Sequence, residues 1–462
     1  MSAASNGLLA CRISRTIRRP GLLMPPTPSP ESRTASATAP PDKARRASGV
    51  FDPSGRMLAL DVLRGLAVLL VIVWHWPGKG AGLGPLGAVS HVGWTGVDLF
   101  FVLSGYLISG LLFKEWDRTG SIVLRRFWLR RGFKIWPAYF AAFGGAMALR
   151  AAAQLNNPGG LRETLEDFRY YLPNFVFIQN YFSGLRHWKY TWSVAVEEHF
   201  YLALPLILLA IASRRRGPGA TTDDGGPAPA ASPFALLPAV AAVVCVGALA
   251  MRVAAMRAGA QWWDVHYLSH LRADALFFGV FIGYCHRYHP AGFARFCRPW
   301  PLLLLAAPAA LAAAPSLYPF TASPVRYGAS LTLIYLGYGG LVALAAVHPD
   351  FGSSFAPARW LAAVGRYSYT IYLAHGAMQM LPRYGRTMTA LGDAGGVWAQ
   401  RAMFVGLALA GGVLLAWLVE RPALRLRERL VPGPRAPHAH APAAPPATAT
   451  AFAAPGSSAA VG

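Results

Sequence analysis

Long apolar stretches alternate with short polar segments from residue 58 to residue 419. A transmembrane helix needs roughly twenty apolar residues, because each residue adds ~1.5 Å and the hydrocarbon core is about 30 Å thick. Stretches of this length predict an all-α fold, a polytopic membrane bundle of about ten transmembrane helices. The predicted spans are 58–76, 95–113, 135–153, 192–212, 234–251, 267–285, 300–319, 327–347, 361–381 and 400–419.

The basic residues indicate on which side of the membrane each loop lies. They gather in clusters between alternate spans, provided that 135–153 is counted as a span despite Pro137 and Arg150. Because cytoplasmic loops are enriched in Lys and Arg, we expect both termini to be cytoplasmic in a multi-pass protein of the cell inner (plasma) membrane. The clusters on the predicted cytoplasmic side are 114–134, 214–216, 287–298 and 421–429.

The segment 166–190 differs from the predicted spans. It is rich in aromatic residues but also holds charged and amide side chains. Because this makes it too polar to cross a membrane, we expect an interfacial or re-entrant loop on the outer side.

The composition excludes several classes of protein. With 54% hydrophobic and 14% charged residues, most of the chain cannot form an ordinary water-soluble fold. The net charge of +23 comes largely from the clusters between spans, so no nucleic-acid partner is predicted. The cysteines lack metal-ligand spacing, and neither a metal site nor a disulfide framework is predicted. They are Cys11, Cys245, Cys285 and Cys297.

The chain divides into three predicted regions. Residues 1–56 are rich in Ser, Pro and Arg and are predicted to be a disordered cytoplasmic tail. An organelle transit peptide is the alternative, because the first acidic residue is Glu31. Residues 57–425 form the predicted membrane domain, and residues 426–462, rich in Ala and Pro, are predicted to be disordered.

Ionisable residues inside a spanning helix are costly and therefore mark candidate functional sites. Arg64 and His75 in the first span are eleven residues apart, so they share one helical face at two depths, ~16 Å apart along the axis. An extended pantetheine arm has a similar length, which places Arg64 to bind a coenzyme A phosphate while His75 meets the thioester. The alternative interpretation makes Arg64 an interfacial anchor and His75 a packed residue.

Further ionisable residues share the predicted depth of His75, in the outer half of the membrane. So many polar side chains at one depth predict a shared buried cavity. A histidine paired with a carboxylate there would suit a general base, since imidazole titrates near neutral pH. The sequence leaves open which carboxylate pairs with which histidine, and any one carboxylate can instead belong to a structural ion pair. These residues are Asp98, Glu197, Glu198, Arg272, Asp274 and His375.

Small residues in the second span, Ser104, Gly105 and Gly110, are spaced for close helix contact. A nucleophilic role for Ser104 would need an adjacent base, and no nucleophile-elbow motif surrounds it. We therefore expect these three positions to serve helix packing.

The basic stretch after the second span contains Arg131 and Lys134, three residues apart on one helical face. They are placed to take the phosphates of a nucleotide-like donor, although most such clusters only set topology or contact anionic lipid. At the start of the fourth span, Trp192 is a candidate for stacking on a sugar ring. The alternative for this tryptophan is a place in an interfacial aromatic belt.

Seven motifs in order carry a family resemblance from about residue 57 to residue 425. The sequence resembles the acyltransferase-3 family of membrane acyltransferases, which includes polysaccharide and peptidoglycan O-acetylases. One such motif would be a weak signal, whereas seven in order are a strong one. The motifs are LDVLRGLAVLLVIVWH, GVDLFFVLSGYLI, FWLRRGFKIWP, WSVAVEEHFYL, LRADALFFG, GRYSYTIYLAHG and VERP.

The resemblance implies a membrane-embedded O-acyltransferase that moves an acyl group from acyl-coenzyme A to a hydroxyl of a carbohydrate or glycolipid. Acetyl is the acyl group that we expect. It implies functional roles for Arg64 and His75, and donor binding by Arg131 and Lys134. The second basic position is usually arginine in the family, so Lys134 replaces a bidentate phosphate contact by a point-charge contact. Acyl-coenzyme A is a substrate in this scheme, and no bound cofactor is expected.

The expected mechanism is general-base catalysis. His75, oriented by Glu197 or Asp98, deprotonates the acceptor hydroxyl for attack on the thioester. A covalent acyl-enzyme relay is the alternative. The predicted acceptor pocket contains Trp192, Glu198, Arg272, Asp274 and His375.

Two further expectations concern partners and competing functions. The hydrolase-like extracytoplasmic domain fused to some relatives has no counterpart in the sequence, so we expect the membrane domain to act alone or with a separate extracytoplasmic transferase. A transporter or flippase of a glycan or lipid-linked substrate is the competing function, because it also places buried charges in a helical bundle.

Overall fold

The computed structural model describes residues 57–78, 85–154, 160–182, 189–214, 232–313, 324–379 and 384–433, and every regular element in these ranges is helical. The predictions for the two tails fall largely outside these residues. The helices are α2 (Leu58–His75), α3 (Pro85–Val92), α4 (Gly96–Thr119), α5 (Leu124–Gln154), α6 (Gly160–Phe175), α7 (Trp192–Ser213), α8 (Leu237–Arg257), α9 (Trp262–Tyr267), α10 (Ser269–Tyr288), α11 (Pro290–Phe296), α12 (Trp300–Ala313), α13 (Pro324–Val347), α14 (Ala356–Arg366), α15 (Ser368–Gln379), α16 (Tyr384–Leu415) and α17 (Arg421–Leu430).

Short helical turns join or extend these helices. The 3₁₀ turns are Gly93–Thr95, Gln179–Tyr181 and Lys189–Thr191, and a π-helical turn at Ala416–Glu420 connects α16 to α17. The last helix, α17, ends at Leu430, five residues past the predicted end of the membrane domain at residue 425.

Among the described residues, six stretches are long and apolar enough to cross a membrane. The structure therefore supports a multi-pass membrane protein and accounts for six of the roughly ten predicted spans. Helices α5 and α10 also reach the required length, but both contain several charged residues. The six stretches are Leu58–His75, Val89–Thr119, Lys189–Ser213, Leu237–Arg257, Gly328–Val347 and Tyr384–Leu430.

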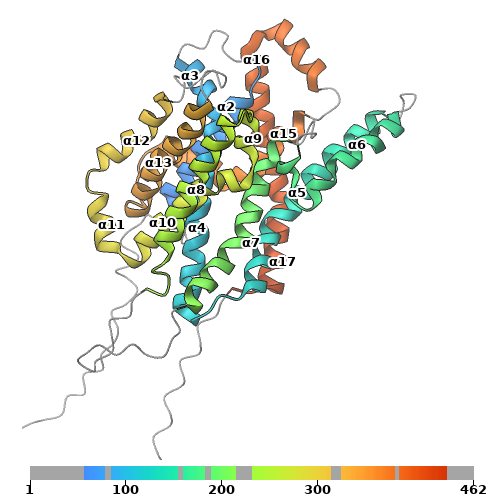
Figure 1. Ribbon diagram of the computed structural model, residues 1–462. Coiled ribbons are helices and arrows are strands. Elements are labelled where there is room, and N and C mark those ends of the chain that lie inside the picture. Colours follow the sequence, from blue (N-terminus) through green and yellow to red (C-terminus); the bar gives the residue numbers. More distant parts are fainter. Residues whose placement is uncertain are drawn as a thin grey trace, which may run out of the picture. The chain divides into compact units, whose positions relative to one another are not determined.

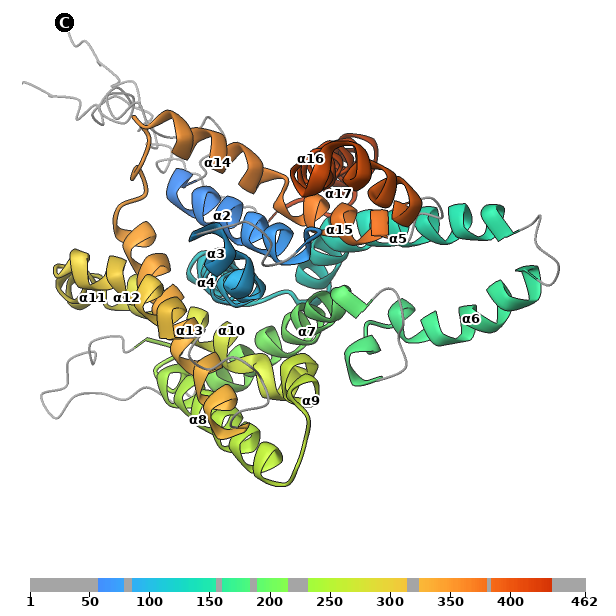
Figure 2. The same ribbon diagram turned by 90° about the horizontal axis from the view of Figure 1, so that it is seen from above.

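The predicted span 361–381 is two short helices rather than one. Helix α14 ends at Arg366, and Tyr367 leaves the helical region with φ −105° and ψ 9° before α15 begins at Ser368. Helix α14 lies beside α2 (Figure 2), and an added Cβ at Gly365 would come 1.9 Å from the backbone oxygen of Asp61. This close approach fixes α14 against α2, and the chain turns directly after it.

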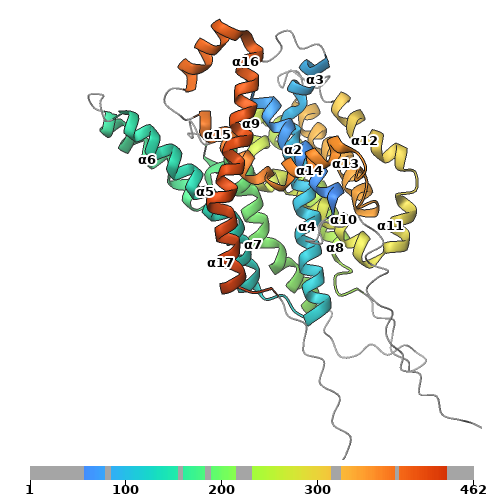
Figure 3. The same cartoon turned by 180° about the vertical axis from the view of Figure 1, so that it is seen from behind.

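The polar segment 166–190 contains a helix where a loop was expected. Helix α6 projects from the side of the bundle together with the far half of α5 (Figures 1 and 3) and runs back alongside it, where Phe175 contacts Phe143. It is followed by the short turn Gln179–Tyr181. The buried side chains of Asn174 and Gln179 anchor this segment: Asn174 accepts a hydrogen bond from the Tyr139 hydroxyl, and Gln179 donates to the Thr191 carbonyl oxygen.

Helices α4 and α10 also approach each other closely through glycine residues. An added Cβ at Gly105 would lie 1.9 Å from the backbone oxygen of Leu276, and one at Gly279 would lie 2.2 Å from that of Val102. Only glycine permits this approach, so the packing prediction is confirmed for Gly105. It is wrong for Gly110, where an added Cβ would meet nothing within 4 Å.

Candidate functional site

A cavity of about 820 Å³, called here the large cavity, lies among α2, α4, α5, α7 and α15. One face of α4 lines it from Val97 through Ser104 to Lys114. At 1.5 Å per residue this face is about 25 Å long. The cavity is therefore long enough to hold an extended ligand.

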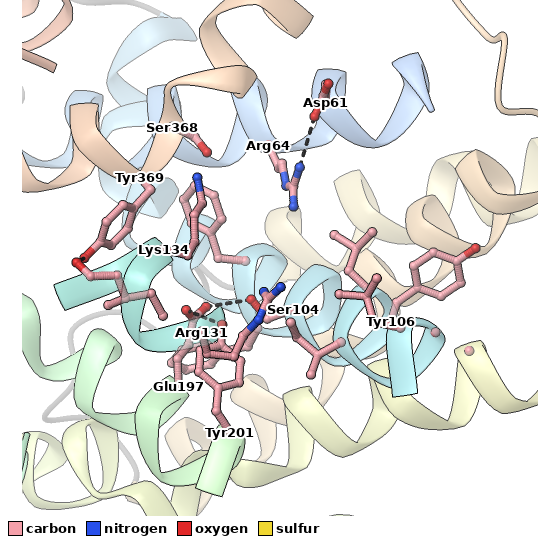
Figure 4. Close-up of a pocket in the computed structure, with 18 of the residues that line it drawn as sticks. Asp61, Arg64, Ser104, Tyr106, Arg131, Lys134, Glu197, Tyr201, Ser368 and Tyr369 are labelled. Carbon is pink, nitrogen blue, oxygen red and sulfur yellow. Dashed lines mark hydrogen bonds and ion pairs between the residues drawn. The ribbon is translucent and has the colours of Figure 1, made fainter. Parts of the chain in front are cut away.

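Three basic residues predicted to bind the donor, Arg64, Arg131 and Lys134, all line the large cavity. Arg64 donates to Asp61 at 3.1 Å, and Lys134 forms an ion pair with the buried Glu420. The Nε of Arg131 is buried and has no hydrogen-bond partner within the described residues. Figure 4 shows Arg64 reaching into the space from α2, while Arg131 enters it from α5.

A carboxylate with two hydroxyl partners lies next to these cations. Ser104 donates to one oxygen of Glu197 at 2.7 Å, and Tyr201 donates to the other at 2.9 Å. Figure 4 shows Arg131 beside this group. Glu197 thus supplies the adjacent carboxylate that a nucleophilic Ser104 would need.

A second cavity of about 300 Å³, called here the small cavity, contains His75 and His375. Their ring centroids lie 4.9 Å apart. The Nδ1 atom of His75 is 2.9 Å from the carbonyl oxygen of Val71, and that of His375 contacts the carbonyl oxygen of Tyr372. Because a carbonyl oxygen can only accept, each Nδ1 carries a proton. In a neutral ring the lone pair is then on Nε2.

The free electron pair of His375 is available for a ligand. Its side chain is fully buried, and the Nε2 atom has no hydrogen-bond partner among the residues that the structure describes. An unpartnered polar atom at this depth is costly unless something binds there.

Aromatic rings form most of the remaining wall of the small cavity. Flat apolar surfaces of this kind suit the stacking of a ring-shaped ligand, and Lys189 contributes a positive charge within 4.8 Å of the Tyr267 ring centroid. The rings that line the cavity include those of Trp74, Trp94, Tyr190, Trp192, Trp262, His266 and Tyr267.

Three other predicted site residues, Asp98, Arg272 and Asp274, are held behind these cavities. Asp98 and Arg272 form an ion pair at 2.6 Å, and Arg252 and Asp274 form another at 2.7 Å, with all four side chains at most 1% exposed. None of them lines either cavity. The Arg272 guanidinium lies 5.7 Å from the Trp192 ring centroid, so this ion pair supports the wall of the small cavity.

Glu198 also has a partner within the bundle. It accepts a hydrogen bond from the indole of Trp136 at 3.1 Å and lines neither cavity. Trp192 and His375 are thus the two members of the predicted acceptor pocket that line the small cavity.

The expected single cavity is divided in two. Arg64 lines the large cavity and His75 the small one, so the two depths predicted for these residues on one face of α2 belong to different spaces. Glu197 lies in the large cavity, while Asp98 is bound by Arg272.

Several residues of the site were not predicted from the sequence. Ser193 and Tyr201 flank Glu197 at four-residue spacing on α7, and a polar stripe of this kind on an apolar helix could have revealed them. Glu420 lies within the VERP motif, but its partner Lys134 is far away in the sequence. Tyr372 lines both cavities, and its place in the GRYSYTIYLAHG motif was the signal that could have revealed it.

Within the described part of the chain, no group of three or more His, Cys, Asp or Glu side chains is arranged to hold a metal ion.

Comparison with known proteins supplies the family. A candidate O-acetyltransferase of Staphylococcus aureus (strain MSSA476) is 37% identical over 163 residues, 34% of this chain and 25% of that protein. The peptidoglycan O-acetyltransferase OatA of Listeria monocytogenes is 34% identical over 161 residues, 33% of this chain and 24% of its own length. The match thus covers about a quarter of each relative. No solved structure matches the chain at a significant level.

The family model for the acyltransferase domain matches residues 57–421, which is most of the chain. This stretch includes the small cavity, all of the large cavity except Leu424 and Arg427, and the motif residues Arg64, His75, Arg131 and Lys134. The chain therefore belongs to the acyltransferase-3 family of membrane acyltransferases.

Proposed function

We propose that this protein transfers an acetyl group from acetyl-coenzyme A to a hydroxyl of a carbohydrate or glycolipid at the plasma membrane. One observation carries the proposal: a long basic cavity and an aromatic cavity with two histidines lie directly against each other. The first suits a phosphorylated donor, and the second suits a sugar and the removal of its hydroxyl proton.

The donor lies in the large cavity in this proposal. Arg64, Arg131 and Lys134 bind its phosphates, and the pantetheine arm follows the face of α4 toward Val97. Guanidinium groups form bidentate contacts with phosphate, whereas Lys134 contributes a point charge that is shared with Glu420. With both termini on the cytoplasmic side, this cavity would receive its donor from the cytoplasm.

The acceptor lies in the small cavity, where its ring stacks on Trp192 and its hydroxyl approaches the histidines. Arg272, with Asp98, holds Trp192 from behind. Asp274 and Glu198 belong to the same supporting layer, because their partners Arg252 and Trp136 fix them within the bundle. These residues shape the acceptor pocket without touching the sugar.

In the chemical step, Nε2 of His75 takes the proton of the acceptor hydroxyl as the hydroxyl oxygen attacks the thioester carbon. A C–O ester bond forms and the C–S bond breaks. The thiolate of coenzyme A leaves and takes up a proton, which the imidazolium can return. Glu197 and Asp98 were the expected orienting carboxylates, but both have other partners, so we assign the orientation of His75 to the Val71 carbonyl oxygen.

The proposal can be tested with membrane vesicles that contain the natural acceptors. Vesicles from cells lacking this gene, and from the same cells expressing the wild-type protein or His75→Ala, are given acetyl-coenzyme A with a labelled acetyl group. We expect alkali-labile label on carbohydrate with the wild-type protein alone. Equal labelling in all three would refute the proposal.

A second experiment, with purified protein, addresses the transporter or flippase and also a separate extracytoplasmic transferase. A transporter moves its substrate without consuming acetyl-coenzyme A, so the purified protein would release no coenzyme A thiol. A purified acyltransferase releases the thiol when carbohydrate extracted from the deletion strain is added. If release of the thiol requires a second protein, the membrane domain acts with a separate partner.

A further inference from the structure

The two cavities share a thin partition. Val97 and Tyr372 each line both of them, so at these two positions one side chain separates the large cavity from the small one. Both side chains are buried. In the proposed reaction the thioester lies on one side of this partition and the acceptor hydroxyl on the other.

The phenol of Tyr372 is fixed from both sides. Its hydroxyl donates to the carbonyl oxygen of Tyr190, a residue of the small cavity. Because that proton is used, the 2.7 Å contact with Ser193 has the serine as donor, and Ser193 lines the large cavity. The backbone oxygen of Tyr372 also binds Nδ1 of His375. The ring is therefore held in place across the partition.

The aromatic rings next to the partition are held in place. The ring of Phe101, which lines the large cavity, meets that of Trp192, which lines the small cavity, edge to face at a centroid distance of 5.8 Å. The Arg272 guanidinium lies within 5.8 Å of both ring centroids. Space for an acyl group at the partition is therefore set by Val97 and Tyr372, since the neighbouring rings are held.

We propose that Tyr372, together with Val97, limits the transferred acyl group to acetyl or one of similar size. The inference rests on the proposed function. Direct transfer requires the acceptor oxygen to come within about 3–3.5 Å of the thioester carbon, so the acyl group must enter the partition. A longer chain would have to displace the fixed phenol, and packed interiors resist even one extra methylene.

The test compares two donors that differ by two methylene groups. Membrane vesicles from the deletion strain, expressing the wild-type protein, Tyr372→Ala, Val97→Ala or Tyr372→Phe, receive labelled acetyl- or butyryl-coenzyme A. The acids released by mild alkali from carbohydrate give the ratio of butyryl to acetyl transfer. Tyr372→Phe is the matched control, because it removes the hydroxyl contacts and retains the ring.

We expect the ratio to rise by at least about tenfold in Tyr372→Ala, and by a smaller factor in Val97→Ala, the scale at which a pocket distinguishes single methylenes. In Tyr372→Phe the ratio should stay within about twofold of the wild-type ratio, whatever the rate. Thermal unfolding of the purified variants confirms folding. If Tyr372→Ala does not fold, Val97→Ala decides alone.

Two outcomes would overturn the inference, and they differ from failure of the proposed function. An unchanged ratio in folded alanine variants would show that the partition does not select the acyl group. An equal rise in Tyr372→Phe would assign selection to the hydroxyl contacts instead of the size of the ring. A wild-type protein that transfers neither acyl group would refute the proposed function itself.

Discussion

The imidazole of His75 on α2 faces that of His375 on α15, with ring centroids 4.9 Å apart. Each ring donates its Nδ1 proton to a backbone carbonyl oxygen within its own helix. The helices thus present two Nε2 atoms of matched protonation to one cavity. Their roles can be separated by substitution.

For His75, we expect alanine to leave donor binding nearly intact and to reduce transfer by about 10²–10⁴-fold, the usual contribution of a positioned base. His75→Gln should be nearly as inactive, because it keeps polarity but cannot titrate. Calorimetry with acetyl-coenzyme A and transfer in vesicles measure the two effects. If His75→Ala retains more than about a tenth of the wild-type rate, the base would instead be His375, and the same pair of variants at that position would locate it.

For the donor site, Arg131→Gln should weaken acetyl-coenzyme A binding by about 10- to 100-fold, since a charge-assisted phosphate contact contributes about 1.5–3 kcal/mol. Lys134→Arg should preserve or tighten binding, because arginine can bind phosphate and Glu420 together. Arg125 is the matched control: it belongs to the same basic cluster, is exposed and lines neither cavity. Equal affinity in all variants would mean that the cluster only sets topology.

Ser104 distinguishes direct transfer from a covalent relay. Under direct transfer, Ser104→Ala should keep the rate within about threefold, because the serine only donates a hydrogen bond to Glu197. A relay through this hydroxyl would lose about 10³-fold or more. Mass spectrometry of protein quenched with acid during turnover is the second measurement. An acetyl group on Ser104 would contradict direct transfer.

The buried pair of Asp98 and Arg272 should be sensitive to the loss of one partner. Arg272→Met leaves an uncompensated carboxylate and should destabilise the fold by about 3–5 kcal/mol. Adding Asp98→Asn should restore much of this stability, because no charge then remains unpaired. Thermal unfolding in detergent measures both changes. A wild-type midpoint for the single variant would show that the pair has little effect on stability.

The topology prediction can be tested with single cysteines in a cysteine-free background. A membrane-impermeant maleimide added from outside should label a cysteine at position 160, at the start of α6, and should not reach one at position 120, at the end of α4. Permeabilised cells should label both positions. The reverse accessibility in intact cells would invert the assignment of the two cavities to donor and acceptor.

The helical class followed from the lengths of the apolar stretches, and the common face of Arg64 and His75 followed from the period of the helix. The break between α14 and α15 did not, because hydropathy averages over a window while Gly365 acts through one close backbone contact. The sequence placed His75 and His375 at a similar depth, but only the fold shows that their rings meet.

The division into two cavities was still harder to predict from the sequence. The predicted depth of the ionisable residues does not reveal that Asp98 binds Arg272 or that Tyr372 separates two spaces. These are pairings between helices far apart in the chain. A periodic pattern within one helix carries no information about them.

The ion pair between Lys134 and Glu420 joins α5 to the turn before the last helix. Membrane proteins are made from the amino terminus onward, so α5 is synthesised long before this partner exists. Until α16 and the turn are in place, Lys134 lacks its counter-charge and the large cavity lacks the wall contributed by Leu424 and Arg427. A nascent chain that has not yet reached residue 427 therefore has an incomplete large cavity, which is the donor site in the proposed function.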